Sequence, residues 1–191
     1  MPPAVFARVV GAVALSLLLA GGSAARAQIE TQVSPMVGGA PMYSTKTIVA
    51  NAKESKDHTT LVAAVKAAGL VDTLDGPGPF TVFAPTNEAF PKLPPGAVDG
   101  LLRPENKAAL VKLLTYHVVA GKVTAARIRS AIKAGKGTAT LTTIEGQPLS
   151  ASLYDDHIVL TDAKGGTATI TIANVTQANG LIHVVDAVLT P

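Results

Sequence analysis

The stretch FTVFAPTNEAF, residues 80–90, decides the fold of this chain. Its first half is a run of aromatic, β-branched and small apolar residues, which predicts a strand over Phe80 to Ala84. The strand ends abruptly at Pro85-Thr86, because proline has no N–H to donate to a neighbouring strand. The turn DGPGP at residues 75–79 precedes the strand and delivers the chain into it.

A second apolar block, NGLIHVVDAVLTP at residues 179–191, predicts a strand over Leu181 to Leu189. Successive strand residues point to opposite faces, so His183 and Asp186 lie on different faces and cannot form a histidine–carboxylate pair. Apolar residues flank both, which indicates a central strand that is buried on both faces. We expect it to pair far from its hairpin neighbours, near the strand Phe80 to Ala84.

The first 27 residues have the pattern of a signal peptide. Arg8 is the positive charge that precedes an apolar run at residues 9–20, and this run is too short to span a bilayer. Ala25-Arg26-Ala27 is the small-x-small pattern that signal peptidase recognises, so the mature chain is expected to begin at Gln28. The alternative is an uncleaved N-terminal anchor. No later apolar segment has spanning length, and we expect export without membrane insertion after cleavage.

Composition excludes several classes of protein. The chain has no cysteine, which excludes disulfides, thiolate chemistry and a cysteine-linked lipid anchor. The formal net charge is +3, and it falls to +1 when Arg8 and Arg26 are removed with the leader. Since no basic run is interleaved with aromatic residues, nucleic acid is not an expected partner.

The remaining chain divides into a helix-rich half and a strand-rich half. Residues 28–44 are punctuated by glycine and proline and are expected to be a flexible segment, and residues 45–191 form one domain. Helices are predicted over 48–53, 61–68, Pro104 to Tyr116 and 125–134. The first is capped by Thr45 or Thr47, the second by Thr59 or Thr60, and the last by Thr124. Gly69 ends the second helix and Gly135 ends the last. Strands are predicted over 118–119, 138–144, 149–154, 158–161, 167–175 and 181–189. This order predicts an α+β domain.

A third motif, Tyr116-His117-Val118-Val119, lies between the two apolar blocks. The three motifs in this order resemble the two signature motifs and the central tyrosine–histidine motif of the fasciclin domain, over about Thr45 to Pro191. The resemblance implies a wedge of β-sheets with several short helices packed on it. The motif positions are Phe80, Thr81, Phe83, Ala84, Pro85, Thr86, Phe90, Gly180, His183, Asp186 and Leu189.

Two readings apply to the short segment after Pro85. The hydroxyl of Thr86 can cap a helix that Pro91 and Pro94 keep very short, with Glu88 favourably placed in its first turn. Alternatively, the exposed edge at Asn87-Glu88 belongs to a partner-binding surface.

Two readings also apply to Tyr116 and His117. Both end an amphipathic helix, where a buried tyrosine hydroxyl and a histidine at the helix C-terminus satisfy internal hydrogen bonds. In the family this pair is associated with adhesion, which would make both residues partner contacts. The physical argument favours the structural reading, because buried polar groups are normally satisfied internally.

Motifs for metal binding, cofactor binding and catalysis are missing from the sequence. The four histidines show no metal-ligand spacing, Asp155-Asp156-His157 lacks the alternating oxygen ligands of a calcium loop, and neither a nucleophile elbow nor a phosphate-binding loop is present. We therefore expect no metal, no cofactor and no enzymatic activity.

The function expected from the resemblance is a secreted bacterial module, periplasmic or extracellular, for adhesion and protein interaction. Its partner would be a cell-surface or extracellular-matrix protein or a glycan. The alternative is a carrier of an apolar ligand such as a carotenoid, because some fasciclin-like proteins bind carotenoids. The low aromatic content, 4% of residues, argues mildly against this carrier.

Overall fold

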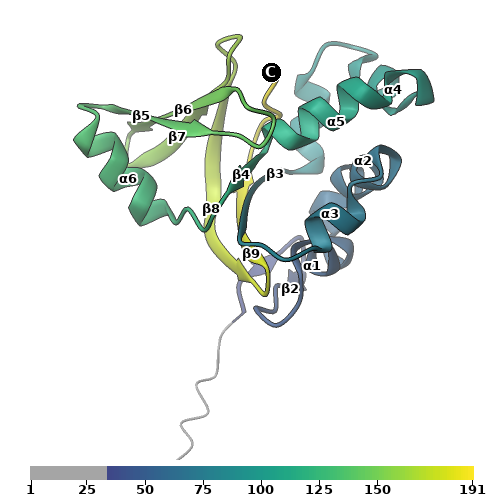
Figure 1. Ribbon diagram of the computed structural model, residues 1–191, viewed down its shortest axis with the longest axis horizontal. Helices are drawn as coiled ribbons and strands as arrows, with labels where there is room; N and C mark the ends of the chain where they lie inside the picture. Colours follow the sequence, from purple (N-terminus) through teal and green to yellow (C-terminus); the bar gives the residue numbers. More distant parts are fainter. Residues whose placement is uncertain (1–33) are drawn as a thin grey trace, which may run out of the picture. The chain divides into compact units, whose positions relative to one another are not determined.

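The computed structural model of the protein describes residues 34–191, which belong to one compact unit that begins at Val33 (Figure 1). The predicted signal peptide, residues 1–27, lies outside the described residues. Strands and helices alternate irregularly along the unit, with the helices concentrated in its first half and the hairpins in its second. The predicted α+β class is confirmed.

Two strands that are distant in sequence form the centre of the main sheet. β3 (Phe80–Pro85) pairs with β9 (Gly180–Val185) in parallel, from Phe80 opposite Gly180 to Pro85 opposite Val185. All six residues of β9 are buried, as predicted for a strand covered on both faces. The strand ends at Val185 and not at Leu189. Asp186 follows it and stays attached to β8, because its N–H donates to Thr169 O and its carboxylate accepts from the Thr169 N–H.

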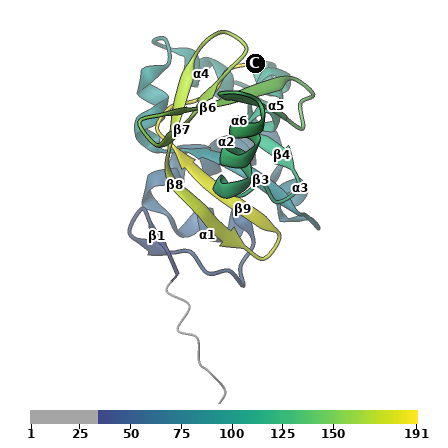
Figure 2. The same ribbon diagram turned by 90° about the vertical axis from the view of Figure 1, so that its left-hand side faces the viewer.

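The sheet has seven strands in the order β4-β3-β9-β8-β7-β6-β5 (Figure 2). The remaining members are β4 (Val118–Ala120), β5 (Thr138–Thr142), β6 (Pro148–Tyr154), β7 (His157–Thr161) and β8 (Thr167–Gln177). Its two outer strands approach each other, since Val119 forms a bridge with Thr143 and the Ile144 N–H donates to Val118 O at 2.7 Å. The sheet is therefore nearly closed on itself.

Helices cover two different parts of the sheet (Figure 1). One group contains α1 (Ile48–Glu54), α2 (Thr59–Ala68), α3 (Val71–Asp75), α4 (Ala97–Leu102) and α5 (Lys107–Tyr116), with the 3-10 helices η1 (Lys56–His58), η2 (Asn87–Lys92) and η3 (Pro104–Asn106). The other is α6 (Ala125–Ala134), which packs on β5, β6 and β7. This arrangement matches the predicted wedge of sheets with short helices packed on it.

Side chains alternate along β3 and β9 and supply two apolar cores. Val82 and Ile182 point into the first core, which contains Ile48, Leu61 and Leu114 of the first helical group. Phe83 and Val185 point into the second core, most of whose other members come from α6 and strands β5 to β8. Tyr116, Val119, Val123 and Leu189 complete this core. The two central strands therefore belong to both cores, which explains their continuous apolar sequences.

The predicted helix caps are correct in two of three cases. Thr47 and Thr124 accept hydrogen bonds from the N–H groups of Ala50 and Arg127, at the first turns of α1 and α6. Gly69 ends α2 with a positive φ of 73°. The predicted cap at Thr59 or Thr60 is wrong, because both residues lie inside α2, whose N-cap position is His58. A side chain from another segment accepts the Thr60 N–H instead, as described below.

The prediction of a flexible segment over residues 28–44 is wrong where the structure describes it. β1 (Met36–Val37) and β2 (Ala40–Pro41) form a hairpin whose two central glycines have positive φ. Val37 and Met42 are buried in the first core. The glycines that suggested flexibility form the turn, and the apolar residues beside them attach the hairpin to the domain.

The helices α3 and α4 were not predicted.

Gly180 tests the close approach of β9 to β3. A Cβ atom at this position would lie 2.1 Å from the carbonyl oxygen and 2.9 Å from the nitrogen of Phe80, both of which are backbone atoms. We expect Gly180→Ala to lower the free energy of unfolding by about 2 kcal/mol or more, because the two strands must separate. Gly100→Ala in α4 is the matched control, since a Cβ there meets nothing within 4 Å. It should be neutral or stabilise the domain in urea unfolding, whereas equal effects of both changes would contradict the proposed register.

Candidate functional site

The imidazole of His117 joins α5 to the residues that follow β9. Its Nδ1 lies 2.8 Å from Leu113 O, and its Nε2 lies 3.0 Å from the Leu189 backbone nitrogen. Leu113 O can only accept and the Leu189 N–H can only donate, so the proton is on Nδ1 and the ring is neutral. Burial lowers the pKa of His117 to about 4, against smaller opposing effects of Leu113 O and Asp162.

The backbone of His117 also contacts the first motif, because its carbonyl oxygen accepts from the Phe83 N–H at 2.9 Å. His117 thus connects all three sequence motifs through Phe83, its own imidazole and Leu189. Only 2% of its surface is exposed. It is not available to a partner in this structure, which contradicts the reading of His117 as a contact residue and supports the structural one.

Tyr116 has the same internal role. Its side chain is fully buried, and its hydroxyl donates to Pro148 O at 3.0 Å and accepts from the Ala163 N–H at 3.2 Å. Burial raises the pKa of Tyr116, and the Ala163 N–H opposes this effect. The reading of Tyr116 as a partner contact is wrong for the same reason as for His117. The ring instead ties α5 to β6 and to the turn after β7.

The carboxylate of Asp162 completes this cluster and was not predicted from the sequence. One oxygen accepts from the N–H groups of Lys164 and Gly166, at 2.9 and 2.7 Å. The other accepts from the N–H and the hydroxyl of Thr190, at 2.8 and 3.0 Å. Asp162 therefore folds the β7–β8 turn and holds the end of the domain in place. The sequence signal, an aspartate before a Lys-Gly-Gly turn, indicates the turn but not the contact with Thr190.

His183 forms a second internal connection, on the face of the sheet where it lies beside Phe83 of β3. The two rings are stacked with their centroids 5.6 Å apart. Its Nε2 lies 2.9 Å from Val123 O, and its Nδ1 lies 3.4 Å from the Asn174 nitrogen, so here the proton is on Nε2. Burial lowers the pKa of His183, against a smaller opposing effect of Val123 O.

The hydroxyl of Thr81 binds the same loop as His183. It accepts from the Val123 N–H at 2.8 Å and donates to Gly121 O at 2.6 Å. The loop between β4 and α6 is therefore held by one residue from each central strand. Because Thr81 belongs to the first motif and His183 to the last, this loop is a second place where the motifs meet.

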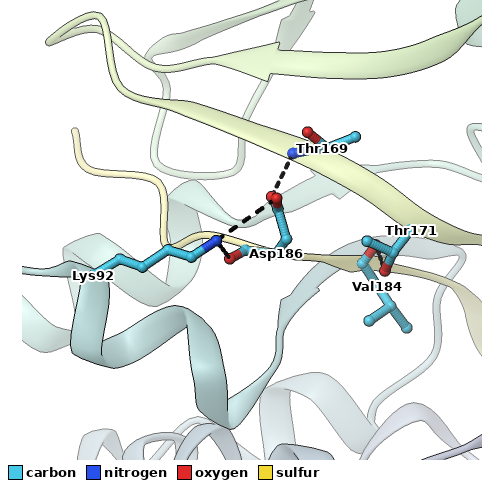
Figure 3. Close-up of polar contacts among 5 residues, drawn as sticks. All are labelled: Lys92, Thr169, Thr171, Val184 and Asp186. Atoms are coloured by element: carbon cyan, nitrogen blue, oxygen red, sulfur yellow. Dashed lines mark hydrogen bonds and ion pairs between the residues drawn. The ribbon is translucent and has the colours of Figure 1, made fainter.

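Asp186 binds Lys92 and Thr169, as Figure 3 shows. Its carboxylate accepts from the Thr169 N–H at 2.7 Å and lies 3.7 Å from Lys92 Nζ, and the same ammonium donates to Asp186 O at 2.7 Å. The Thr171 hydroxyl donates to Val184 O nearby at 3.2 Å. Asp186 thus fastens the end of β9 to β8 and to the end of η2. His183, by contrast, binds the β4–α6 loop.

Asn87 is a structural residue. Its side-chain oxygen accepts from the Thr60 N–H at 3.0 Å and from the Thr59 hydroxyl at 3.2 Å, and its amide donates to Lys56 O at 2.7 Å. Asn87 therefore caps α2 from a distant segment, which contradicts a free contact role for its side chain. Thr86 occupies the N-cap position of η2, but its hydroxyl makes no capping hydrogen bond there. Glu88 is exposed, and its role in binding stays a prediction.

Three small apolar cavities lie between the first helical group and the sheet. All three are lined by Leu61, and two of them by His117. Their volumes are about 20 to 30 Å³, an order of magnitude below the roughly 300–1,000 Å³ typical of ligand pockets. A surface groove of about 560 Å³ between α4 and α5 is open to solvent and has Lys112 and Lys164 on its rim. The three cavities are therefore too small for a polyene, and the groove is an open surface feature that does not enclose a ligand.

Within residues 34–191, no group of three or more histidine, cysteine, aspartate or glutamate side chains could hold a metal ion. In the same range, no helix is both long and apolar enough to cross a membrane. Thr81, Tyr116, His117, His183 and Asp186 each bind a backbone group of another segment through the side chain. The geometry of the motifs is that of a scaffold.

The pH dependence of stability tests the role of His117. The folded pKa of about 4 lies below the ordinary value of 6.5, so between these values the unfolded state binds the extra proton. The free energy of unfolding should therefore fall as pH falls through this window, by up to about 1.4 kcal/mol per pH unit from this residue. His117→Gln should cost about 1–3 kcal/mol at pH 7 and should flatten the slope between pH 6.5 and 4.

Urea unfolding at several pH values measures both effects. His58 and His183, whose pKa values burial also lowers, leave a residual slope in the variant. His157 is exposed, and His157→Gln should cost less than about 0.5 kcal/mol at pH 7. An unchanged slope in His117→Gln would contradict a neutral, buried imidazole.

Asn87 and its neighbour Glu88 give a second test. Asn87→Ala should lower the free energy of unfolding by about 1–2 kcal/mol, because α2 loses its cap and Lys56 O loses a donor. Glu88→Ala should stay within about 0.5 kcal/mol, since the side chain is exposed. Thermal melts of the two single variants distinguish the positions, and equal melting temperatures would refute the capping role.

Comparisons with known proteins agree with this fold. The family model of the fasciclin domain matches residues 56–191. Protein sll1483 of Synechocystis sp. is 44% identical over 187 residues, which cover 97% of each chain. Immunogenic protein MPB70 of Mycobacterium bovis is 35% identical over 145 residues, which cover 73% of this chain and 66% of the relative. Cell surface glycolipoprotein MPB83 of the same species is 34% identical over 151 residues, 79% of this chain and 56% of the relative.

A solved structure shows the same architecture. The FAS1 domain pair from the insect cell adhesion molecule Fasciclin I aligns with a TM-score of 0.68 and 18% sequence identity, over 76% of this chain and 51% of the other. At this identity the likeness is one of fold. Together with the match over residues 56–191 and the bacterial relatives, it confirms the resemblance found in the three motifs: the chain belongs to the fasciclin domain family.

Proposed function

We propose that this protein is an exported, non-enzymatic module that attaches cells to a surface or matrix by binding a cell-surface or matrix molecule. Fasciclin-domain proteins are typically extracellular and adhesion-related, and they are generally non-enzymatic. One bacterial relative is described as a cell surface glycolipoprotein. The predicted signal peptide supports the same compartment, periplasmic or extracellular.

The observation that best supports a binding function is that the motif side chains are buried and form internal hydrogen bonds. Tyr116, His117 and His183 are buried, and each hydrogen bonds to the backbone of another segment. Two histidines with lowered pKa values are suited to holding loops in place and stay neutral at physiological pH. The motifs thus supply a rigid core, and a partner can reach only what this core displays on the surface.

Adhesion of cells to the purified protein tests the proposal. Wells coated with the mature protein should retain cells of the producing organism above wells coated with an unrelated protein of similar charge. Binding should survive chelators and reducing agents, since the chain has no cysteine. The control is wild-type protein that is unfolded before coating, which should lose the adhesion together with the fold. Retention equal to the unrelated protein would overturn the proposal.

An absorption spectrum separates adhesion from the carrier alternative. Protein purified from its native host should show no visible absorption band, because the cavities between helices and sheet are too small for a polyene. A visible chromophore that copurifies with the folded protein would instead favour a carrier, and it would require the helical group to move away from the sheet.

A further inference from the structure

A long interval in the middle of the chain has basic residues and no acidic ones. Between Glu105 and Glu145 the sequence has neither aspartate nor glutamate. The basic residues of this interval are Lys107, Lys112, Lys122, Arg127, Arg129, Lys133 and Lys136. Since the whole chain has a formal charge of only +3, the positive charge is strongly concentrated here.

Five of these residues gather on α6 and its two ends. Ala125, Ile128 and Ile132 form the buried face of the helix. Arg127, Arg129 and Lys133 are exposed on the remaining surface, with Lys122 before the helix and Lys136 after it. Arg129 and Lys133 share one side of the exposed surface, and Arg127 lies on its other side. We call these five side chains together the basic face of α6. Figure 2 shows α6 in front of the sheet, at the surface of the domain.

The basic face is not neutralised by the rest of the domain. The ion pairs among residues 34–191 join Lys92 to Asp186, Arg103 to Glu105 and Lys112 to Glu145. None of them includes a residue of the basic face. The guanidinium of Arg129 donates to a backbone oxygen, Asp156 O, at 2.8 Å. This contact places the turn between β6 and β7 beside the helix. The turn contains two carboxylates, those of Asp155 and Asp156.

Such a face has an energetic cost in the isolated protein. Arg129 and Lys133 are four residues apart on one side of the helix, where like charges destabilise it. An ordinary solvated helix mixes signs, as α1 does with Lys53 and Glu54. A concentrated positive field is useful when it attracts a polyanion and releases that polymer's counterions.

The surroundings of α6 favour a flexible anionic chain over an anionic bilayer. The exposed positions between the basic residues are Ala126, Ser130, Ala131, Ala134 and Gly135, which offer no large apolar side chain to insert into lipid. A flat bilayer resting on α6 would also meet Asp155 and Asp156, whereas a flexible chain that contacts the helix and Tyr154 can bend around these two carboxylates. Tyr154, on the strand end before this turn, is 76% exposed and presents an aromatic face beside the basic residues.

We propose that the basic face of α6 binds an anionic polysaccharide, with Arg127, Arg129 and Lys133 contacting its acidic groups and Tyr154 packing against its sugar rings. This inference rests on the proposed adhesive function and names the chemistry of its partner. Arginine suits this role because its planar guanidinium can bind a sulfate, phosphate or carboxylate group with two hydrogen bonds.

A charge-reversal pair tests the assignment with fluorescently labelled dextran sulfate, against neutral dextran. Arg127→Glu with Lys133→Glu should weaken binding to dextran sulfate at least about tenfold at 0.1 M salt and reduce the slope of log affinity against log salt by about two. The control is Lys53→Glu with Lys66→Glu, which changes the net charge equally at exposed positions on α1 and α2. It should retain affinity within about threefold, because charge contacts are local at this ionic strength.

Three outcomes would overturn the inference. Equal losses in both double variants would show a non-specific effect of net charge, and absence of wild-type binding to dextran sulfate would remove the polysaccharide. Binding of wild type to vesicles of anionic phospholipid but not to dextran sulfate would replace the polysaccharide with lipid.

Tyr154→Ala should lower affinity for dextran sulfate about threefold while leaving the salt slope unchanged.

The cell-coating assay separates this inference from the proposed function. If wild type and the α6 variant retain cells equally, adhesion stands and the role of the basic face fails. If dextran sulfate binds but no cells are retained, the polysaccharide site stands and adhesion fails.

Discussion

The parallel pairing of β3 with β9 is the constraint on which the rest of the structure depends. These strands are about a hundred residues apart, and each belongs to both apolar cores. At their first residues Gly180 faces Phe80 so closely that a side chain is excluded. At their last residues Asp186 fastens β9 to β8 and η2. Helices on one face and hairpins on the other can pack only when this register is correct.

Neutral histidines maintain the connections around that pair. His117 binds the segment after β9, and His183 binds the loop before α6, each with one ring nitrogen as donor and the other as acceptor. A protonated imidazole would lose its acceptor in either place, and burial lowers both pKa values against the smaller opposing effect of the carbonyl oxygens that accept from each ring. The motifs that identify the family therefore describe its interior, and the features that recognise a partner are to be sought on surfaces such as α6.

Local chemistry was sufficient to predict much of the fold and little of the site. Thr47, Thr124 and Gly69 act on their own helices, so their roles follow from neighbouring residues. The α2 cap comes instead from Asn87, in another segment, and no local pattern indicates it. Asp162 was missed for the same reason, because its partner Thr190 is distant in sequence. The pairing of β3 with β9 was predictable because both strands are apolar on both faces, and only a central position satisfies that.

The protonation states of the two histidines test the central claim most directly. Two-bond ¹H–¹⁵N NMR spectra of the imidazoles at pH 6 distinguish the two neutral forms from each other and from the charged form. The structure predicts opposite neutral forms, with the proton of His117 on Nδ1, facing Leu113 O, and the proton of His183 on Nε2, facing Val123 O. The same tautomer at both residues, or a charged ring at either, would contradict an interior built on these two connections.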